Sequence, residues 1–408
     1  MGKRELELYI HIPFCVQKCA YCDFLSAPAD AETRSGYVEA LIREIRAAKS
    51  KYSGYRVSTV FLGGGTPSIL EGDETARIFH ALFQNFDIAA DAEVTMEANP
   101  GTVTEEKAEI WKTSGVNRLS IGLQSVNDRE LRMLGRIHTF GEFLHTWETV
   151  HRAGFENVNI DLISAIPGQT AGSWEKTLRT AAELEPEHLS AYSLIVEEGT
   201  PFYDWYGGQE QTDSIAAAGI RRGMMPPLPD EDEEREIYQL TKRILEEYGY
   251  HRYEISNYAK DGYECRHNLG YWERKEYLGL GLGASSLIRE CRFRNTADME
   301  KYLKILADPA KYPGKYAGAE VENMLAEEYE TLTRSDRMEE FMFLGLRKTA
   351  GIREADFRNI FGEDIRQVYG KQIGKLIGQE LLAGSDGRLY LTERGIDISN
   401  YVFSEFML

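Results

Sequence analysis

The chain has 408 residues, of which 42% are hydrophobic and 28% are charged, and its formal net charge is −19 at pH 7. This acidity disfavours a nucleic-acid partner, because phosphate binding needs a basic face. No run approaches the roughly 18 consecutive apolar residues of a membrane-spanning helix. Because the five cysteines are odd in number and the amino terminus lacks a signal-peptide pattern, we expect a cytoplasmic protein in a reducing compartment.

Six strand-like runs, rich in Val, Ile, Leu and Tyr, recur in the first half of the chain. They cover residues 6–12, 59–64, 92–99, 118–125, 157–165 and 188–195. Helical patterns such as YVEALIREIRAAK and WEKTLRTAAELE lie between them. This alternation predicts an α/β fold with a parallel sheet, and six units favour a partial (β/α)6 barrel. Ligands of such a fold bind at the carboxyl ends of the strands.

The sequence changes character after residue 200. Gly, Pro and acidic clusters predict a linker and a boundary near 205–230, and a helix is expected to begin near Pro229 and Asp230. From about residue 330, three helical patterns and a hairpin, LLAGSDGRLYLTERG, indicate a helical, winged-helix-like domain. This segment is not markedly basic, so it does not indicate DNA binding. We therefore expect a core at 1–230, a core extension at 231–325 and a C-terminal domain at 326–408.

Three of the five cysteines, Cys15, Cys19 and Cys22, follow the first strand with the spacing C-x3-C-x2-C. Three thiolates from one loop suit three irons of a [4Fe-4S] cluster and leave the fourth iron without a protein ligand. A structural zinc site is the alternative, but it needs four ligands, and neither Cys265 nor Cys291 belongs to a second C-x2-C pair. Unrelated free thiols are the other alternative.

Glycines and polar side chains follow the later strands. The second strand is followed by GGGTP at 63–67, and Glu97, Gln124 and Asp161 lie at the third, fourth and fifth strands. Taken alone, the glycines are typical of an ordinary turn. Each polar residue, taken alone, could be a helix cap or a loop residue. Several such groups at successive strand ends of one barrel instead indicate a ligand site.

The cysteine spacing after the first strand and GGGTP after the second resemble the radical S-adenosylmethionine (radical SAM) superfamily. The resemblance implies that the open iron binds the amino and carboxylate groups of S-adenosylmethionine. It also implies that an electron from the reduced cluster cleaves the sulfonium and yields a 5'-deoxyadenosyl radical.

Further segments between residues 9 and 286 resemble the oxygen-independent coproporphyrinogen III oxidase family, namely YIHIPFC, FLGGGTPS, MEANPGT, NRLSIGLQS, LGRIH, NIDLI and YLGLGLGASS. The resemblance implies that Tyr9 lies beside the sulfonium and Tyr21 along the adenine. It implies that the rest of the S-adenosylmethionine site is made by Gly64, Gly65, Thr66, Glu97, Gln124, Arg136 and Asp161. Without the family context, Arg136 would be an ordinary solvated residue.

Three features resemble the heme chaperone branch of this family. The oxidases resemble the pattern C-x3-C-x2-C-x-C, and in this chain Phe24 occupies the position of its fourth cysteine. Only fourteen residues precede Cys15, whereas the oxidases carry a longer leading segment. The segment 264–272, ECRHNLGYW, contains the H-N-x-x-Y-W signature associated with heme binding. The resemblance implies that His267 contacts heme, with Cys265 as a rival ligand and an aromatic surface at Tyr271 and Trp272. Judged alone, His267 would be a capping or buried histidine.

The resemblance therefore implies a heme chaperone with a [4Fe-4S] cluster, S-adenosylmethionine and heme as cofactors. Its partners would be a recipient hemoprotein, such as a respiratory enzyme, and an electron donor such as flavodoxin or ferredoxin. The alternative is an oxygen-independent coproporphyrinogen III oxidase, which decarboxylates its substrate to protoporphyrinogen IX. Radical chemistry on an unrelated small molecule is a third interpretation, but no particular motif supports it.

Overall fold

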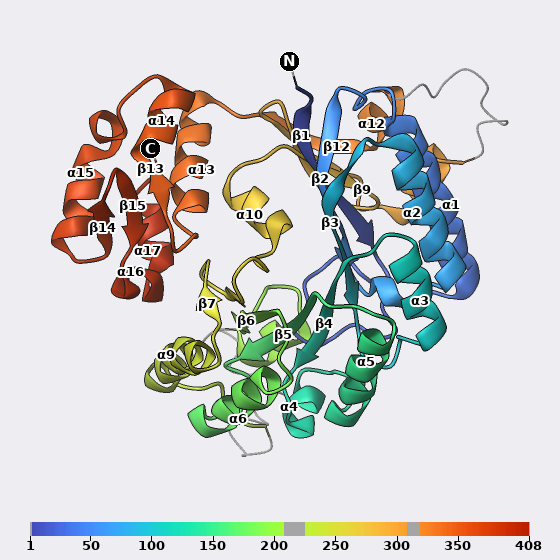
Figure 1. The fold of residues 1–408 in the computed structure, drawn as a ribbon, viewed down its shortest axis with the longest axis horizontal. Coiled ribbons are helices and arrows are strands. Elements are labelled where there is room, and N and C mark those ends of the chain that lie inside the picture. Colours follow the sequence, from blue (N-terminus) through green and yellow to red (C-terminus); the bar gives the residue numbers. More distant parts are fainter. Residues whose placement is uncertain (1, 208–224, 308–318, 408) are drawn as a thin grey trace.

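The computed structural model describes residues 2–207, 225–307 and 319–407. Six parallel strands form the core of an open, curled sheet (Figure 1), and they confirm the six predicted runs: β1 (Arg4–Ile12), β2 (Tyr55–Gly64), β3 (Ile88–Ala98), β4 (Arg118–Gln124), β5 (Val158–Ser164) and β6 (His188–Ser193). The intervening helices are α1 (Ala31–Ala48), α2 (Gly72–Asn85), α3 (Glu105–Thr113), α4 (Asp128–Met133), α5 (Phe140–Arg152), α6 (Ala171–Ala182) and α7 (Pro201–Tyr206), with a short 3-10 helix, η1 (Pro67–Ile69).

Later segments extend both edges of this sheet. Strand β9 (Tyr277–Leu280) adds a seventh parallel strand beside β1, and an antiparallel ribbon follows, made of β10 (Ser285–Ile288), β11 (Cys291–Asn295) and β12 (Ala326–Thr331). At the other edge, β8 (Asn257–Ala259) pairs with β6, and β7 (His251–Arg252) pairs with β8. The helices of this region are α9 (Glu231–Glu247), α10 (Arg266–Trp272), α11 (Met299–Ile305) and α12 (Ala319–Leu325).

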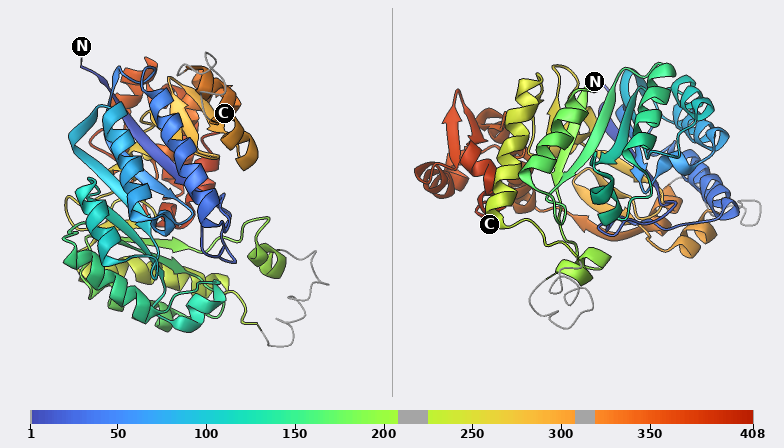
Figure 2. Two further views of the ribbon diagram at one scale, coloured as in Figure 1. Left: turned by 90° about the vertical axis from the view of Figure 1, so that its right-hand side faces the viewer. Right: turned by 90° about the horizontal axis from the view of Figure 1, so that it is seen from below.

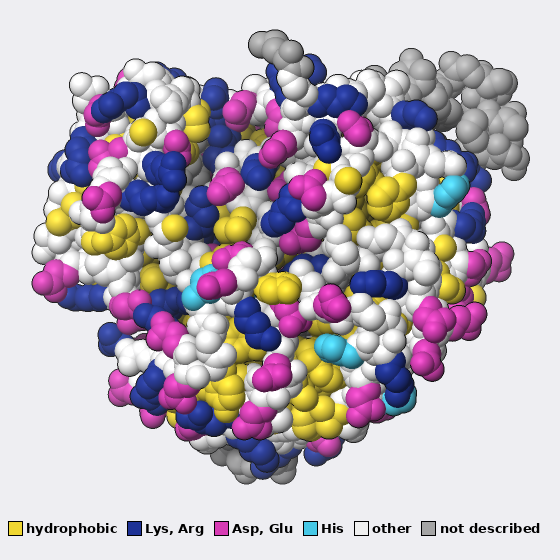
Figure 3. Space-filling model, viewed as in Figure 1, with side chains coloured by type: hydrophobic (Ala, Val, Ile, Leu, Met, Phe, Trp, Pro, Cys, Tyr) yellow, Lys and Arg dark blue, Asp and Glu magenta, His cyan; other side chains and the backbone are white. Residues whose placement is uncertain are grey.

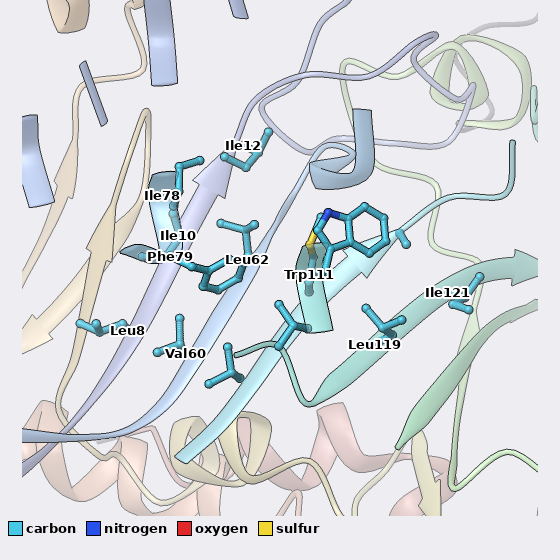
Figure 4. Packing of buried hydrophobic residues seen from close by; sticks show 14 of the residues in the cluster. Leu8, Ile10, Ile12, Val60, Leu62, Ile78, Phe79, Trp111, Leu119 and Ile121 are labelled. Atoms are coloured by element: carbon cyan, nitrogen blue, oxygen red, sulfur yellow. The ribbon is translucent and has the colours of Figure 1, made fainter. Parts of the chain in front are cut away.

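Alternation along the core strands, interrupted by register shifts in β1, β2 and β4, separates an apolar outer face from a more polar inner face. On the outer face, Ile10, Leu62 and Ile121 are fully buried in one large hydrophobic cluster with Phe79 and Trp111 of the covering helices (Figure 4). The inner face carries polar side chains on the same strands. The helices therefore hold the barrel together from outside and leave its interior for polar groups.

The predicted acidic helix is α9, and it begins one residue after its N-cap, Asp230, whose carboxylate accepts the backbone N–H of Glu233 at 2.9 Å. Four acidic residues fill its first turn, where they stabilise the positive end of the helix dipole. The boundary expected at 205–230 contains residues 208–224, which lie outside the described residues. Among the described helices, none is long and apolar enough to cross a membrane.

The C-terminal domain has its own hydrophobic core, which runs from Met338 to Phe406. It contains the three predicted helices, α13 (Arg334–Gly345), α14 (Glu354–Phe361) and α15 (Ile365–Gly378), and the predicted hairpin of β14 (Leu382–Ser385) and β15 (Arg388–Leu391). Strand β13 (Ile352–Arg353) and helices α16 (Glu393–Asp397) and α17 (Ser399–Ser404) complete it. Helix α9 lies between this domain and α6 (Figure 2). Because β12 reaches Thr331, the first residues of the predicted 326–408 unit belong to the large sheet.

Substitutions of two phenylalanines on α2 test the assignment of the outer hydrophobic core. Phe79 is 1% exposed, whereas Phe83 on the same helix is 45% exposed. We expect Phe79→Ala to lower the free energy of unfolding by about 3 to 5 kcal/mol, because it leaves a cavity in the core. Phe83→Ala, the matched control, should cost about 0.5 kcal/mol or less. Urea denaturation followed by circular dichroism measures both, and equal losses would contradict the assignment of the core.

Candidate functional site

The loop between β1 and α1 carries the three closely spaced cysteines. Its two sides are joined where the backbone N–H of Cys15 donates to Ala27 O at 3.2 Å. Its middle is tied to the end of α4 where Ala20 N–H donates to Leu134 O at 3.0 Å. These backbone bonds turn the loop so that all three thiols line one cavity, Cys15, Cys19 and Cys22.

The glycines of GGGTP let a second loop press directly against the cysteine loop. Gly65 N–H donates to Ile12 O at 2.8 Å, and Thr66 N–H donates to Phe14 O at 2.7 Å. A Cβ atom on Gly65 would lie 2.5 Å from Phe14 O, closer than real Cβ contacts allow. Glycine is therefore required here by close backbone approach. The Thr66 hydroxyl also donates to Cys15 Sγ at 3.5 Å.

The cavity between these loops has a volume of about 400 Å³ and opens at the carboxyl ends of the core strands. It brings together most of the predicted site residues: Cys15, Cys19, Tyr21, Cys22, Gly64, Gly65, Thr66, Glu97, Gln124, Arg136 and Asp161. Tyr9 does not line it. The Tyr9 ring stacks on Phe61 with ring centroids 6.3 Å apart, and its hydroxyl lies 3.0 Å from His11 Nδ1. A contact of Tyr9 with the sulfonium stays a prediction.

Two carboxyl groups line the cavity, and their ionisation sets its negative charge. Glu97 accepts the backbone N–H of Gly64 at 3.1 Å, and burial, with a further contribution from Asp161, raises the pKa of Glu97 to about 8. Asp161 accepts the Ser120 hydroxyl and the Asn159 amide, both at 2.8 Å, and burial raises its pKa as well. A positively charged ligand beside them would favour their ionised forms.

Arg136 links the cysteine loop to the floor of the cavity. Its guanidinium donates to Cys19 Sγ at 3.6 Å, to Gly122 O at 3.0 Å and to Asn99 Oδ1 at 2.7 Å. The Asn99 amide in turn donates to the Thr66 hydroxyl at 2.8 Å. Sequence reasoning missed Asn99, although its position two residues after Glu97 in MEANP places it next on the same side of the extended chain.

The donor set fits a cluster better than a single ion. No group of three or more His, Cys, Asp or Glu side chains in the described part of the chain converges on a point where one metal ion would bind. Three thiolates that each bind a different iron of one cluster need not converge in this way. Burial raises the pKa of the Cys22 thiol to about 11, so metal binding has to displace its proton.

Exposed hydrophobic side chains surround the mouth of the cavity. Phe24 is 61% exposed, Ile195 is 66% exposed, and Tyr192 is 42% exposed, although all three line the cavity. Sequence reasoning singled out Phe24 but not the other two. Tyr192 and Ile195 come from the end of β6 and the loop after it, where the sequence alone showed only an apolar run.

His267 lies at the opposite ends of the strands and does not reach the cavity. Its Nδ1 is 2.7 Å from the Thr59 hydroxyl, its Nε2 is 3.0 Å from the Tyr271 hydroxyl, and its ring stacks on Phe61. The side chain is buried, and burial lowers its pKa to about 3, so the ring is neutral. Cys265 is fully buried, with Sγ 3.5 Å from Glu93 Oε1. A heme contact through His267 stays a prediction.

Helix α10, which contains His267, closes the amino-terminal end of the barrel. The backbone N–H groups of Arg266 and His267 donate to the Glu93 carboxylate at 2.9 and 3.1 Å. Gly270 packs directly on the Glu7 carboxyl, where a Cβ atom would collide with both oxygens. Neither oxygen of Glu7 has a hydrogen-bond partner among the described residues. The H-N-x-x-Y-W segment is thus part of the barrel floor.

Comparisons with known proteins agree with this geometry. The pattern of the radical SAM superfamily matches residues 9–181, and that of the HemN C-terminal domain matches residues 332–398. The heme chaperone HemW of Lactococcus lactis is 36% identical over 100% of this chain and 99% of that protein. The chain belongs to the heme chaperone HemW family. The heme chaperone HemW of Bacillus subtilis is 34% identical, with 98% of each chain covered.

A solved structure, that of the coproporphyrinogen III oxidase HemN from Escherichia coli, superposes with a TM-score of 0.80. It covers 100% of this chain and 90% of that one, at 23% sequence identity. This likeness shows the fold alone, an open radical SAM barrel with a helical C-terminal domain. As a radical SAM protein, the chain has a [4Fe-4S] cluster and S-adenosylmethionine as cofactors.

The cysteine assignment predicts which thiols hold iron. We expect Cys15→Ala, Cys19→Ala and Cys22→Ala each to lose most of the iron and sulfide of anaerobically reconstituted protein, because each removes one of three cluster ligands. Cys291→Ala, on strand β11 away from the cavity, is the matched control and should keep both. Iron analysis and the visible absorption of the cluster measure this. Loss of iron in the control, or its retention in the other three, would contradict the assignment.

The buried Glu7 carboxyl predicts a pH dependence of stability. Burial raises the pKa of Glu7 to about 9, whereas a carboxyl in an unfolded chain ionises near about pH 4.3. Its stabilising neutral form is complete below the lower value and is lost as the pH rises through the higher one. The free energy of unfolding should therefore fall between about pH 5 and pH 9.

Glu7→Gln should flatten this decline, because the amide does not ionise. Glu109→Gln, an exposed position on α3, is the control and should keep the wild-type slope. Urea denaturation at several pH values measures both slopes. Identical slopes for wild type and Glu7→Gln would show that Glu7 is already ionised in the folded protein.

Proposed function

We propose that this chain is a heme chaperone, which binds heme and delivers it to a hemoprotein with the help of its cluster and S-adenosylmethionine. The observation that carries the proposal is the 36% identity with a heme chaperone over the full length of both chains. The cavity supports it further, because its three thiols belong to one loop and the neighbouring position at the mouth is Phe24, which has no thiol to offer the fourth iron.

In this proposal Cys15, Cys19 and Cys22 hold three irons of the cluster. The Arg136 guanidinium and the Thr66 hydroxyl, which donate to Cys19 Sγ and Cys15 Sγ, offset the negative charge of the thiolates. When bound, the reduced cluster supplies the electron that cleaves the sulfonium of S-adenosylmethionine.

The same cavity provides a second set of groups for S-adenosylmethionine. We propose that Gly64, Gly65 and Thr66 hold its methionine end through backbone groups, which are free of bulky side chains. Tyr21 lines the cavity and packs against Phe202 with ring centroids 6.4 Å apart, and we propose that its ring lies along the adenine. The rest of the proposed site has carboxylates suited to a cationic ligand and flanking polar groups: Glu97, Gln124, Arg136 and Asp161.

The oxidase alternative has less support. Its structural relative is 23% identical, which establishes a common fold and no more. Phe24 stands where the family resemblance places an additional cysteine in the oxidases, and its side chain is 61% exposed at the mouth of the cavity. We therefore propose that the cavity does not decarboxylate coproporphyrinogen III.

The remaining parts of the proposal concern partners and location. On the family resemblance, we propose a respiratory hemoprotein as the recipient and a flavodoxin or ferredoxin as the electron donor. We propose that the protein works in the cytoplasm, where a reducing medium maintains thiols. All five cysteines lie in the described ranges and are free of disulfide bonds, which supports this location.

The proposal predicts heme transfer without porphyrin chemistry. Anaerobically reconstituted protein should bind hemin with a shifted Soret band and pass it to an apo-hemoprotein acceptor, as measured by the acceptor's own Soret spectrum. With reductant and S-adenosylmethionine, it should not convert coproporphyrinogen III, as measured by chromatography of the products. Accumulation of protoporphyrinogen IX would instead establish the oxidase function, and absence of hemin binding would overturn the proposal.

A further inference from the structure

A second cavity lies between the barrel floor and the C-terminal domain. Its volume is about 690 Å³, within the range of roughly 300 to 1,000 Å³ that is usual for small-molecule sites. One wall comes from β7 and α10, and the other from α13, β13, α14 and β15 (Figure 1). No lining residue is shared with the thiol cavity at the other end of the strands. We call it the domain cleft.

The walls of the domain cleft combine apolar and aromatic side chains with charged ones. Trp272, the last residue of the H-N-x-x-Y-W segment, lines it, and the Arg347 guanidinium lies 4.3 Å from the centre of the indole ring. This cation–π contact fixes the plane of the indole. Ile360 on α14 is 52% exposed, although it is a large aliphatic side chain. The other apolar lining residues are Leu269, Phe341 and Ile352.

Two arginines of the domain cleft lie directly opposite each other. Arg353 on β13 pairs in register with Arg388 on β15. Like charges at such positions repel each other and destabilise the pair of strands. Neither arginine forms a salt bridge with any carboxylate in the described part of the chain, and Arg388 donates only to Ala350 O, at 3.1 Å. An anionic ligand with two carboxylates would relieve this repulsion.

Apart from Asp356, which also lines the domain cleft, its other charged side chains already have partners. Arg274 donates to Glu340 at 2.7 Å and to Glu290 at 2.8 Å, and Lys348 donates to Glu273 at 3.1 Å. The Arg274–Glu340 pair joins the turn after α10 to α13, and the Lys348–Glu273 pair joins the same turn to the segment after α13, so they hold the two walls together. Figure 3 shows Lys and Arg side chains mixed with acidic and apolar ones along the border between the two domains. The opposed arginines therefore remain as the cations available to a ligand.

His251 is the one histidine among the described residues that line the domain cleft. Its side chain is 40% exposed, with Nε2 2.9 Å from Glu264 Oε1 and Nδ1 3.3 Å from Asp261 Oδ1. An exposed contact of this kind contributes little to stability, so the imidazole can exchange it for another ligand. His267 also has both ring nitrogens engaged, but its contacts are buried inside the barrel floor.

We propose that the domain cleft is the heme site, with the two propionates on Arg353 and Arg388, the porphyrin ring against Trp272 and Ile360, and His251 as the axial ligand of the iron. Heme is flat, apolar and doubly carboxylated, which matches the apolar side chains of the cleft and two guanidinium groups that have no carboxylate partner. A neutral imidazole is a common axial ligand of heme iron. This inference rests on the proposed function and names the place where heme binds.

The charge part of the inference is tested with the double variant Arg353→Ala/Arg388→Ala in the full-length, cluster-reconstituted protein. Hemin titration followed in the Soret band should show a dissociation constant raised by about tenfold or more, because two charge-assisted contacts are lost. Arg394→Ala, an exposed arginine of the same domain that does not line the cleft, is the control and should bind as wild type does. The dimethyl ester of hemin should bind wild type and the double variant equally.

The ligand part is tested with His251→Ala and His267→Ala. His251→Ala should change the Soret position and the spin state of bound hemin, whereas His267→Ala should lower the melting temperature and leave that spectrum unchanged. The inference is overturned if the double variant binds hemin as tightly as wild type, or if His267→Ala alone alters the spectrum. Wild-type protein that binds no hemin would overturn the proposed function itself, which is a different result.

Discussion

Two backbone hydrogen bonds between the cysteine loop and the GGGTP loop hold the thiol cavity in shape. Gly65 N–H reaches Ile12 O, and Thr66 N–H reaches Phe14 O, at a distance that leaves no room for a side chain on Gly65. The GGGTP loop therefore lies directly against the cysteine loop, with the Thr66 hydroxyl on Cys15 Sγ. Because the GGGTP loop contains no thiol or imidazole to bind iron, a small molecule can occupy the space beside the cluster, and the Arg136 guanidinium offsets the negative charge of the thiolates.

The barrel uses its two ends differently. At the carboxyl ends of the strands, Glu97 and Asp161 surround a cavity that is open to ligands. At the amino ends, Glu93 binds the first backbone N–H groups of α10, and Glu7 lies beneath Gly270. Helix α10 is thus fixed to the barrel on one side, while its last residue reaches the domain cleft on the other. A chaperone built in this way would carry heme at one end of the barrel and the cluster at the other.

Much of the fold could be predicted from sequence, because alternating apolar residues mark both the core strands and the faces they bury. The spacing of Cys15, Cys19 and Cys22 located the cavity, since one short loop cannot spread three thiols far. The sequence could not show which of these side chains are buried in the barrel. His267 belongs to a segment that is polar and aromatic, and only the fold shows that both of its ring nitrogens are used within the barrel floor.

The residues that were missed depend on contacts between distant parts of the chain. Asn99 joins Arg136 to Thr66, and each partner comes from a different loop. Arg353 and Arg388 are 35 positions apart and become neighbours through strand pairing alone, so neither attracted notice as a charged residue in a mixed sequence. Local patterns predict elements well, whereas sites built from several elements require the register between them.

The central requirement is one iron of the cluster that has no side-chain ligand. Electron paramagnetic resonance of the reduced, anaerobically reconstituted protein, recorded with and without S-adenosylmethionine, tests it most directly. We expect about four irons per chain and a spectrum that changes when S-adenosylmethionine is added, because the open iron gains a ligand. A spectrum indifferent to S-adenosylmethionine, in protein that holds its full complement of iron, would contradict this requirement.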